Sequence, residues 1–191
     1  MKKTILITGA SSGIGEGCAR KFASQGARLI LNSRSADKLT ALAEKLKEKY
    51  DAECYVMPFD VCNRESAAAA LNALPQEWKS IDVLVNNAGL AIGVDKEYEG
   101  NLDEWDVVID TNVKALLSMT RLVVPGMVER GRGHIINIGS MASCSGDLGS
   151  TAYACAKAGV DKLTEYTALQ YGKMNIRCNC VRPGLIVTPQ N

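Results

Sequence analysis

The sequence predicts an α/β domain in which a doubly wound parallel sheet lies between two layers of helices. Short apolar runs of strand length alternate with longer amphipathic segments along the whole chain, and this alternation is typical of βαβ units. No Pro-, Ser- or Gly-rich linker interrupts the pattern. With 191 residues, of which 47% are hydrophobic, the chain can form a sizeable core. We therefore expect residues 1–191 to form a single domain.

Each expected strand is a short run rich in apolar residues. The six runs are 4–8 (TILIT), 27–31 (ARLIL), 53–57 (ECYVM), 81–85 (IDVLV), 133–138 (GHIINI) and 175–181 (NIRCNCV). Such runs are typical of strands that are buried on both faces of a parallel sheet.

Segments with apolar residues at helical spacing fill the gaps between the strands. They predict helices at 14–25, 36–49, 64–73, 103–130 and 152–171. Ser35 is suited to cap the second helix, and Gly172 is placed to end the last one. Pro125 should either bend the long fourth helix or divide it in two, and neither outcome changes the topology.

The composition argues against several classes of protein. The formal net charge is +1 and no basic block is present, so nucleic acid is not an expected partner. The apolar run after the two N-terminal lysines is too short for a secretory signal. No stretch of about 18 apolar residues occurs, so we expect no membrane span. The expected location is the cytoplasm.

The cysteines and the single histidine do not predict a metal site. Seven cysteines are scattered through predicted helices and strands, which suits a reducing compartment. Strand alternation places Cys178 and Cys180 on one face, but no second Cys/His pair accompanies them, so small buried side chains are the preferred interpretation. His134 is interpreted as a strand-edge residue.

A glycine-rich turn, TGASSGIG at 8–15, follows the first strand and opens the first helix. Gly9 allows a tight turn, Gly13 lets the backbone approach a pyrophosphate, and Gly15 allows close packing of helix on strand. N–H groups at the helix start attract the anion. A turn without a ligand is the alternative. The predicted cofactor contacts are Gly9, Ser11, Ser12, Gly13, Ile14 and Gly15.

The end of the second strand indicates which dinucleotide binds. LILNSRS offers Asn32, Ser33 and Arg34, with no carboxylate before Asp37. NAD enzymes use an acidic residue about 20 positions after the glycines to hold the ribose 2′-hydroxyl, whereas a guanidinium favours a 2′-phosphate. We therefore predict NADP (NADPH) as the preferred cofactor, with NAD as the alternative. The competing interpretation of Arg34 is a solvated surface charge.

Tyr153 and Lys157 lie four residues apart in YACAK, so a helix places them on one face. Hydride transfer between a secondary alcohol and a ketone requires an acid or base beside the oxygen. A free tyrosine titrates at about 10, and a neighbouring cation is the simplest way to lower that pKa. Ser140 ends the run HIINIGS at the carboxyl edge of the sheet, where open α/β sheets bind ligands. Its hydroxyl can polarise the substrate oxygen.

The GxxxGxG turn, Ser140 and the Tyr153–Lys157 pair resemble the short-chain dehydrogenase/reductase family over essentially the whole chain. The resemblance implies a Rossmann-type three-layer α/β/α fold and an NAD(P)-dependent oxidoreductase acting on CH–OH groups. It also implies a fourth catalytic residue, because Asn112 matches the family asparagine that holds a water between the lysine and solvent. Tyr153 and Lys157 are further expected to contact the cofactor, with Lys157 binding the nicotinamide ribose. Ser12 departs from the basic residue that many NADP-dependent relatives have.

The same resemblance implies further cofactor contacts. DV at 60–61 resembles a pair that contacts adenine, NNAG at 86–89 resembles an element that lines the cofactor cleft, and RPGLIVT at 182–188 resembles a segment that contacts the nicotinamide carboxamide through Ile186 and Thr188. The expected contacts are Asp60, Val61, Asn87, Ala88, Gly89, Pro183, Gly184, Ile186 and Thr188.

Family members usually continue past this threonine into a substrate-covering segment, another helix and a seventh strand. We therefore expect the 1–191 domain to lack the lid and the seventh strand, either because the sequence is incomplete or because a short form is covered by a partner chain. The resemblance also implies a homodimer or homotetramer that pairs the helices at 103–130 and 152–171.

The small-molecule substrate, a ketone or secondary alcohol, stays open between three types. The segment 86–140 resembles dehydrogenases of 3-hydroxy acids such as serine, and the segment from Tyr153 onward resembles hydroxysteroid dehydrogenases and 3-oxoacyl carrier-protein reductases. The loop 141–151 has no arginine to bind a carboxylate, which favours a neutral compound; Met141, Cys144 and Leu148 are candidate substrate contacts. A non-catalytic dinucleotide-sensing module and an inactive fragment are the alternatives to an enzyme, and the intact catalytic set argues against the sensor.

Overall fold

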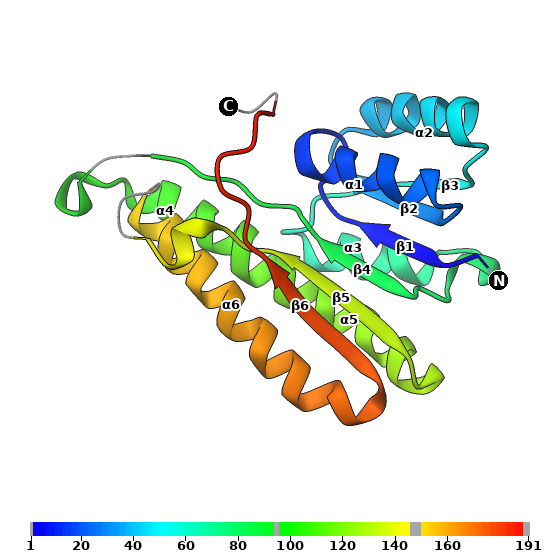
Figure 1. The fold of residues 1–191 in the computed structure, drawn as a ribbon. Helices are drawn as coiled ribbons and strands as arrows, with labels where there is room; N and C mark the ends of the chain where they lie inside the picture. Colours follow the sequence, from blue (N-terminus) through cyan, green and yellow to red (C-terminus); the bar gives the residue numbers. More distant parts are fainter. Residues whose placement is uncertain (1, 94–95, 146–149, 189–191) are drawn as a thin grey trace.

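The computed structural model describes residues 2–93, 96–145 and 150–188. Six of the segments in this part of the chain form one parallel sheet with the strand order β3-β2-β1-β4-β5-β6 (Figure 1). The strands are β1 (Thr4–Ile7), β2 (Arg28–Ser33), β3 (Cys54–Pro58), β4 (Val83–Asn86), β5 (Gly133–Ile138) and β6 (Ile176–Val181). The α-helices are α1 (Gly13–Ser24), α2 (Ala36–Tyr50), α3 (Arg64–Asn72), α4 (Leu102–Ile109), α5 (Ala115–Arg130) and α6 (Thr151–Tyr171).

Short helical turns complete the described chain. They are the 3₁₀ turns η1 (Gln76–Trp78), η2 (Glu97–Glu99), η4 (Met141–Ser143) and η5 (Gly172–Met174), and the π-helical segment η3 (Asp110–Lys114). The order of strands and helices matches the predicted order, and all six predicted strands are present within two residues of their expected ends.

The winding of the chain reverses at the middle of the sheet. Strands β2 and β3 extend from one side of β1, and β4, β5 and β6 extend from the other. Helices α1 and α2 pack on one face, and α3, α5 and α6 pack on the other (Figure 1). The predicted three-layer, doubly wound fold is confirmed. Its reversal point leaves a crevice at the carboxyl ends of β1 and β4, which is where such folds bind ligands.

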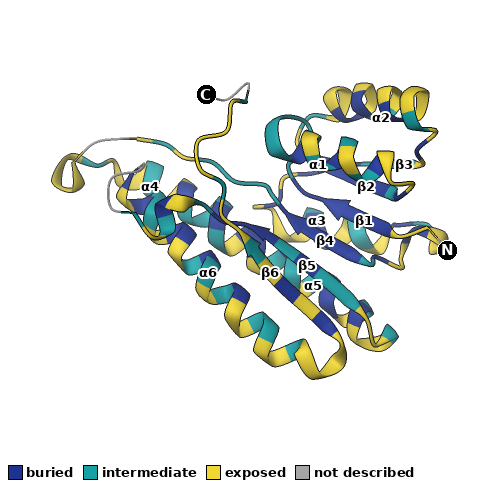
Figure 2. Ribbon diagram, viewed as in Figure 1, coloured by how far each residue is buried: buried dark blue, intermediate teal, exposed yellow. Residues whose placement is uncertain are grey.

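Alternate residues of each strand face the two helical layers. In β1, Leu6 packs with α5, whereas Ile5 and Ile7 pack with α1 and α2. The central strands are therefore buried on both faces (Figure 2). This burial explains why their sequences are continuous apolar runs without a polar face.

The long fourth helix departs from the prediction. Pro125 lies inside α5 without ending it, and the irregular part is the π-helical segment Asp110–Lys114, which separates α4 from α5. The predicted helix is therefore not divided at Pro125; it is divided a few turns earlier, at the π-helical segment. Local sequence gave no signal for it, because the preference for a π-helical turn depends on what its side chains contact.

The two predicted helix boundaries have different outcomes. Ser35 caps α2, since its side chain accepts a hydrogen bond from the Lys38 N–H. Gly172 does not adopt the left-handed conformation of a helix-ending glycine; the chain continues into η5, and Asn175 is the left-handed residue, with φ 59°. The Asn175 side chain donates to the Gly131 carbonyl at 3.0 Å, which fixes the turn before β6.

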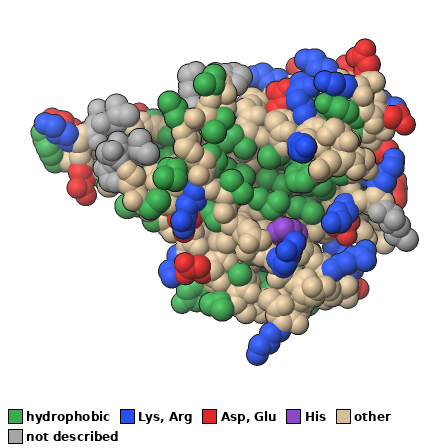
Figure 3. Space-filling model, in the orientation of Figure 1, with side chains coloured by type: hydrophobic (Ala, Val, Ile, Leu, Met, Phe, Trp, Pro, Cys, Tyr) green, Lys and Arg blue, Asp and Glu red, His purple; other side chains and the backbone are tan. Residues whose placement is uncertain are grey.

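At the β6 edge, the sheet is exposed on the face that carries α1 and α2. Arg177, Asn179 and Val181 of β6 point to this face and are exposed, and Figure 3 shows hydrophobic side chains gathered in the middle of the same side of the molecule. His134 is the second residue of the interior strand β5, and its Nε2 lies 2.9 Å from Asn179 Nδ2. Burial and nearby cations lower the pKa of His134. Its contacts are those of a structural side chain.

Three expectations from composition can be compared with the described residues. None of the helices described is long and apolar enough to cross a membrane. The seven cysteines are all unpaired thiols. Within residues 2–93, 96–145 and 150–188, no cluster of three or more His, Cys, Asp or Glu side chains could hold a metal ion.

Candidate active site

The sheet brings distant parts of the chain to one edge. Because all six strands are parallel, their carboxyl ends meet there. Residues predicted to bind the cofactor or to act in catalysis lie at these ends or just after them. In the order of the strands along the chain, they are at 8–15, 32–34, 60–61, 87–89, 140 and 183–188.

The glycine turn has the geometry that its sequence predicts. Gly9 and Gly13 are left-handed, with φ 65° and 55°, a conformation that favours glycine. Gly15 is buried at the start of α1, and a Cβ there would overlap the Gly9 carbonyl oxygen and lie 2.5 Å from Asn87 Nδ2. The N-cap Ser12 makes no side-chain hydrogen bond to the helix. The first N–H groups of α1 are therefore left for an anion such as a phosphate.

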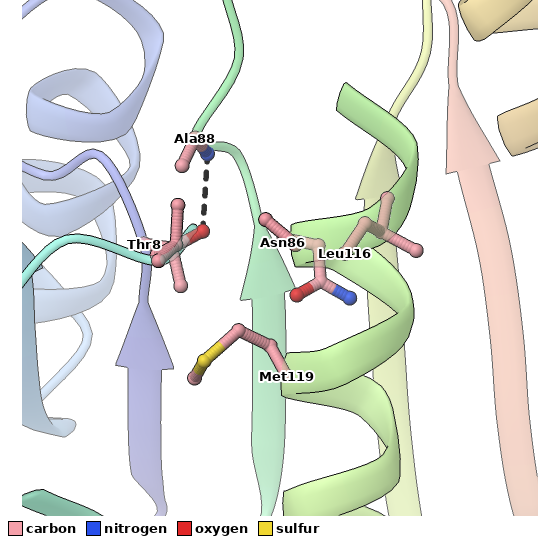
Figure 4. Close-up of a pocket in the computed structure, with 7 residues that line it drawn as sticks. Thr8, Asn86, Ala88, Leu116 and Met119 are labelled. Carbon is pink, nitrogen blue, oxygen red and sulfur yellow. Dashed lines mark hydrogen bonds between the residues drawn. The ribbon is translucent and has the colours of Figure 1, made fainter. Parts of the chain in front are cut away.

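Thr8 joins the glycine turn to the loop after β4. Its Oγ1 accepts hydrogen bonds from the N–H groups of Asn87 and Ala88, both at 3.0 Å, and Asn87 Nδ2 donates to the Thr8 and Gly9 carbonyls. Figure 4 shows Thr8 and Ala88 facing each other between β1 and β4, beside a cavity of about 10 Å³. That cavity is far too small for a nucleotide. These bonds serve to hold the two loops together at the crevice.

The three predicted cofactor residues at the end of β2 differ in how far their side chains are exposed. Asn32 is fully buried, and its Nδ2 donates to the carbonyls of Met57 and Phe59, both at 3.1 Å. Its side chain therefore joins β2 to the end of β3 instead of facing the surface. Ser33 is half-buried and Arg34 is exposed. Among the three, Ser33 and Arg34 are the side chains open to a ribose or a 2′-phosphate.

Asp60 and Val61 follow β3, on the same side of the crevice as Arg34. Asp60 is exposed, and its Oδ1 accepts a hydrogen bond from the Cys62 N–H at 2.9 Å. Val61 is buried in the core, and it also lines an open groove of about 430 Å³ between the start of α3 and η3. The pair predicted to contact adenine therefore lies beside this groove, and Val61 contributes an apolar side chain to its lining.

Asn112 lies in the π-helical segment η3. Its Nδ2 donates to the carbonyls of Val108 at 2.9 Å and Leu90 at 2.7 Å. Its Oδ1 is buried and has no hydrogen-bond partner among the described residues. A Cβ on Gly89 would lie 2.6 Å from this oxygen and 3.4 Å from Lys157 Nζ. The amide oxygen and the ammonium group therefore flank the same glycine, and π-helical turns of this kind recur at functional sites.

Lys157 is 5% exposed, and its Nζ donates to the Ile138 carbonyl at 2.8 Å. The same Nζ lies 5.6 Å from the centre of the Tyr153 ring. Burial lowers the pKa of Lys157 to about 8, although the nearby Cys180 and Asp161 raise it. Tyr153 is half-buried against an apolar cluster that includes Val108. Helix α6 thus places the two side chains together below the end of β5.

Ser140 follows β5 and caps the short turn η4. Its Oγ accepts a hydrogen bond from the Ala142 N–H at 3.1 Å, which leaves the hydroxyl hydrogen available to another acceptor. Met141 and Cys144, which were predicted as substrate contacts, are exposed. The third predicted contact, Leu148, lies outside the described residues.

The segment after β6 returns across the crevice. The Met141 N–H donates to the Pro183 carbonyl at 3.0 Å, which ties the segment to η4. At its far end, a Cβ on Gly13 would lie 3.5 Å from Thr188. Gly184 and Ile186 are exposed between these two points. Residues 183–188 therefore span from the Ser140 side of the site to the glycine turn.

The burial of Lys157 predicts a pH-dependent stability. Between pH 8 and 10.5 the unfolded lysine holds a proton that the folded lysine has released, so stability rises with pH through this window and is lost as pH falls through 8. From pH 8 to 9, we expect the free energy of unfolding to rise by about 1 kcal/mol more in the wild type than in Lys157→Met. Urea titrations without cofactor measure the difference.

Subtracting the pH dependence of Lys157→Met from that of the wild type removes contributions from groups that do not act on Lys157. These include Cys54 and Cys178, whose pKa values burial raises to about 11 and about 12. Lys173→Met, at an exposed position after α6, is the matched control and should keep the wild-type pH dependence. Identical slopes for wild type and Lys157→Met would contradict the prediction.

This fold and this set of side chains define an oxidoreductase of the dinucleotide-binding type. A family model described as short chain dehydrogenase matches residues 3–191, and the chain belongs to that family. The chain is 40% identical over 182 residues to NADP-dependent 3-hydroxy acid dehydrogenase YdfG of Escherichia coli K12. The matched region covers 95% of this chain and 72% of that protein. The predicted family is therefore confirmed.

Solved structures agree with this assignment. A closed form of serine dehydrogenase complexed with NADP⁺ matches with a TM-score of 0.90 and 39% identity, over 97% of this chain and 73% of that chain. L-sorbose reductase from Gluconobacter frateurii, complexed with NADPH and L-sorbose, matches with a TM-score of 0.92 and 35% identity, over 99% of this chain and 72% of that chain. The protein is an oxidoreductase acting on CH–OH groups, and the predicted enzyme class is confirmed.

Some residues that shape the site were missed by the sequence analysis. Thr8 was quoted only as the start of the glycine turn, yet it holds that turn to the loop after β4. Asn137 lies inside β5, where it accepts from Asn86 at 2.9 Å and donates to Thr164 of α6 at 2.9 Å. A polar residue within the apolar run HIINI was the available signal, because a buried amide requires partners.

Proposed function

We propose that this protein transfers a hydride between NADP(H) and a small secondary alcohol or ketone, with Tyr153, Lys157, Ser140 and Asn112 as the catalytic residues. The observation that carries the proposal is the shared position of the Lys157 ammonium group, the Tyr153 ring and the unpartnered Asn112 oxygen around the loop after β4. When bound, the nicotinamide supplies or accepts the hydride.

The chain's own residues have separable roles in this proposal. Tyr153 gives a proton to the ketone oxygen during reduction and takes it back from the alcohol during oxidation. Ser140 donates a hydrogen bond to the same oxygen, using the hydroxyl hydrogen that its contact with the Ala142 N–H leaves available. Lys157 supplies a positive charge below the tyrosine. Asn112 has its Oδ1 beside Gly89, close to the Lys157 ammonium group, and can hold a water through which the proton is replaced from solvent.

The residues present fit a dinucleotide. The glycine turn gives close backbone approach and uncapped N–H groups for the phosphates, and Ser33 and Arg34 are open to the adenosine end. Relatives named as NADP-dependent, and structures named as NADP⁺ and NADPH complexes, support NADP as the cofactor. The prediction drawn from Arg34 and from the absence of a carboxylate agrees with them.

Changing Arg34 should alter cofactor preference. A guanidinium–phosphate contact is worth about 1.5–3 kcal/mol, so Arg34→Gln should raise KM for NADPH about 10- to 100-fold while KM for NADH changes little. Steady-state kinetics with both cofactors measure the ratio. Lys38→Gln, an exposed change in the next helix, is the control. Equal effects on NADPH and NADH would mean that Arg34 does not contact the 2′-phosphate.

For the substrate, we propose a 3-hydroxy acid or its 3-oxo form. The curated relative at 40% identity carries that activity in its name, and serine dehydrogenase, a structural neighbour at 39% identity, acts on a compound of the same type by its name. A neutral ketone is the second candidate. It is favoured by the absence of arginine in the loop 141–151 and by the likeness to L-sorbose reductase.

A substrate panel tests the proposal. NADP⁺ reduction would be followed with serine, allo-threonine and 3-hydroxybutyrate, and NADPH oxidation with L-sorbose, a hydroxysteroid ketone and a 3-oxoacyl thioester. The proposal expects the highest kcat/KM with a 3-hydroxy acid. Preference for sorbose or the steroid would favour the neutral ketone. NADPH binding without turnover of any compound would favour a dinucleotide sensor or an inactive fragment.

The proposed setting of the enzyme is a homo-oligomer in the cytoplasm, with residues 1–191 acting as one cofactor-binding and catalytic unit. Free cysteines support a reducing compartment. Exposed apolar side chains on α5 and α6, namely Leu117, Val128, Tyr166 and Leu169, support subunit contacts through these helices. Light scattering of the purified chain would give the oligomeric state.

A further inference from the structure

Asp161 is a half-buried carboxylate for which the proposed mechanism has no role. It lies on α6 one turn after Lys157 and two turns after Tyr153, so the three side chains share one stripe of the helix. Its side chain is 14% exposed. A carboxylate in such a position requires partners, because burying an unpaired charge is costly.

The partners of Asp161 come from two other elements of the site. Oδ1 accepts a hydrogen bond from Arg182 Nε at 3.0 Å. Ser143 and Cys180 lie close enough to favour the ionised form of the carboxylate. Burial raises the pKa of Asp161, but Arg182, Ser143 and Cys180 outweigh burial and hold the pKa below its usual value. The group is therefore a carboxylate at neutral pH.

Each partner leads directly to a functional segment. Ser143 ends η4, and its hydroxyl donates a hydrogen bond to the Ser140 carbonyl at 2.8 Å. Arg182 begins the segment that reaches Thr188 beside the glycine turn. Gly139 has no room for a side chain here, since a Cβ would lie 2.5 Å from Cys180 Sγ and 3.4 Å from Asp161 Oδ1. The carboxylate is thus packed directly against the backbone that carries Ser140.

We propose that Asp161 is a positioning residue of the active site, whose carboxylate ties α6 to the turn behind Ser140 and to the segment 182–188. Backbone hydrogen bonds already join that turn to that segment, from Gly139 N–H to the Val181 carbonyl at 2.7 Å and from Met141 N–H to the Pro183 carbonyl at 3.0 Å. Asp161 adds the link from this pair to the helix that carries Tyr153 and Lys157. The inference rests on the proposed function for its catalytic consequence.

The same carboxylate acts on Lys157 through space. The titratable and charged groups around Lys157 are Tyr153 and Asp161 on α6 and Cys180 on β6, and Asp161 favours the charged lysine. Loss of the negative charge should therefore make Lys157 release its proton at lower pH. This gives a readout that a purely structural role would not change.

Three variants test the proposal. Asp161→Asn removes the charge and keeps the shape, Arg182→Gln removes one partner, and Glu165→Gln is the matched control, an exposed carboxylate one turn further along α6 that pairs with Lys162. The kinetic measurements are kcat and KM for NADPH with the best substrate. The third measurement is the pH at which the free energy of unfolding, without cofactor, begins to rise as folded Lys157 loses its proton.

For Asp161→Asn we expect kcat to fall about 10-fold, since small displacements of reacting groups have effects of this size or larger, and the stability rise to move about 0.5 unit to lower pH. Arg182→Gln should raise KM for NADPH severalfold without a shift to lower pH. Glu165→Gln should match the wild type.

Wild-type kcat in Asp161→Asn, an unshifted stability rise, or an equal loss in Glu165→Gln would each overturn the proposal. If Asp161→Asn does not fold, Arg182→Gln decides, and wild-type values of kcat and KM in that variant would overturn it. A wild-type protein without turnover would count against the proposed function, whereas the pH of the stability rise would still decide the role of Asp161.

Discussion

Tyr153→Phe should reduce turnover about 1,000-fold while NADPH still binds within about threefold of the wild-type affinity. General acid–base catalysis contributes about 10²- to 10⁴-fold, and the change removes the only group of the tyrosine that can carry the proton. The apolar ring stays in place against Val108 and its cluster, so the fold and the cofactor site should be unaffected. Steady-state rates and fluorescence titration with NADPH measure the two effects.

Tyr166→Phe is the control for this experiment. Tyr166 lies on the same helix but is 58% exposed, so the loss of its hydroxyl should change neither rate nor binding. Unchanged turnover in Tyr153→Phe would contradict the proposed mechanism. A loss of NADPH binding together with turnover would instead assign Tyr153 to the cofactor site.

Gly15→Ala should have the largest effect on stability. An added Cβ would overlap the Gly9 carbonyl oxygen and lie 2.5 Å from Asn87 Nδ2. The first of these is backbone, which cannot rotate away. Either α1 must move from β1 or the glycine turn must distort, and overpacking of this kind costs about 3 kcal/mol or more. Urea denaturation should show the loss, and NADPH affinity should fall because the turn also forms the predicted phosphate site.

Gly17→Ala provides a matched control two residues further along α1. A Cβ at Gly17 meets nothing within 4 Å, and alanine is favoured over glycine inside a helix by about 1 kcal/mol. This variant should be slightly more stable than the wild type. If the two alanine variants had similar stability, the close packing assigned to Gly15 would be wrong.

The predicted fold was confirmed because its signals are local and repeated. Continuous apolar runs such as LIL at 29–31 and VLV at 83–85 are what burial on both faces of a parallel sheet requires, and the glycine turn marks where the first strand meets the first helix. The π-helical segment around Asn112 could not be predicted in this way. Its amide bonds to the carbonyls of Leu90 and Val108, and the first of these lies in a loop that only folding brings near.

The candidate site also contains residues that local patterns predict and residues whose roles only the fold shows. Tyr153, Lys157 and the glycine turn could be found from sequence because each is a short pattern with a fixed spacing. Asn32 was placed among the cofactor contacts by its position at a strand end, yet its side chain bonds to β3. Asp161 gave no signal, because one carboxylate on a helix is an ordinary surface charge until the fold shows what it touches.

The sequence by itself determined the family, the sheet with its helices, the preference for NADP and the identity of the candidate catalytic residues. Only the tertiary structure decided how those residues are held: Thr8 by the loop after β4, Asn112 and Lys157 beside Gly89, and Asp161 by Arg182 and against Gly139. The physical reason is that strand and turn patterns reflect interactions between near neighbours in the chain. Hydrogen bonds and buried charges join residues that are far apart in sequence, and their partners are defined only when the chain has folded.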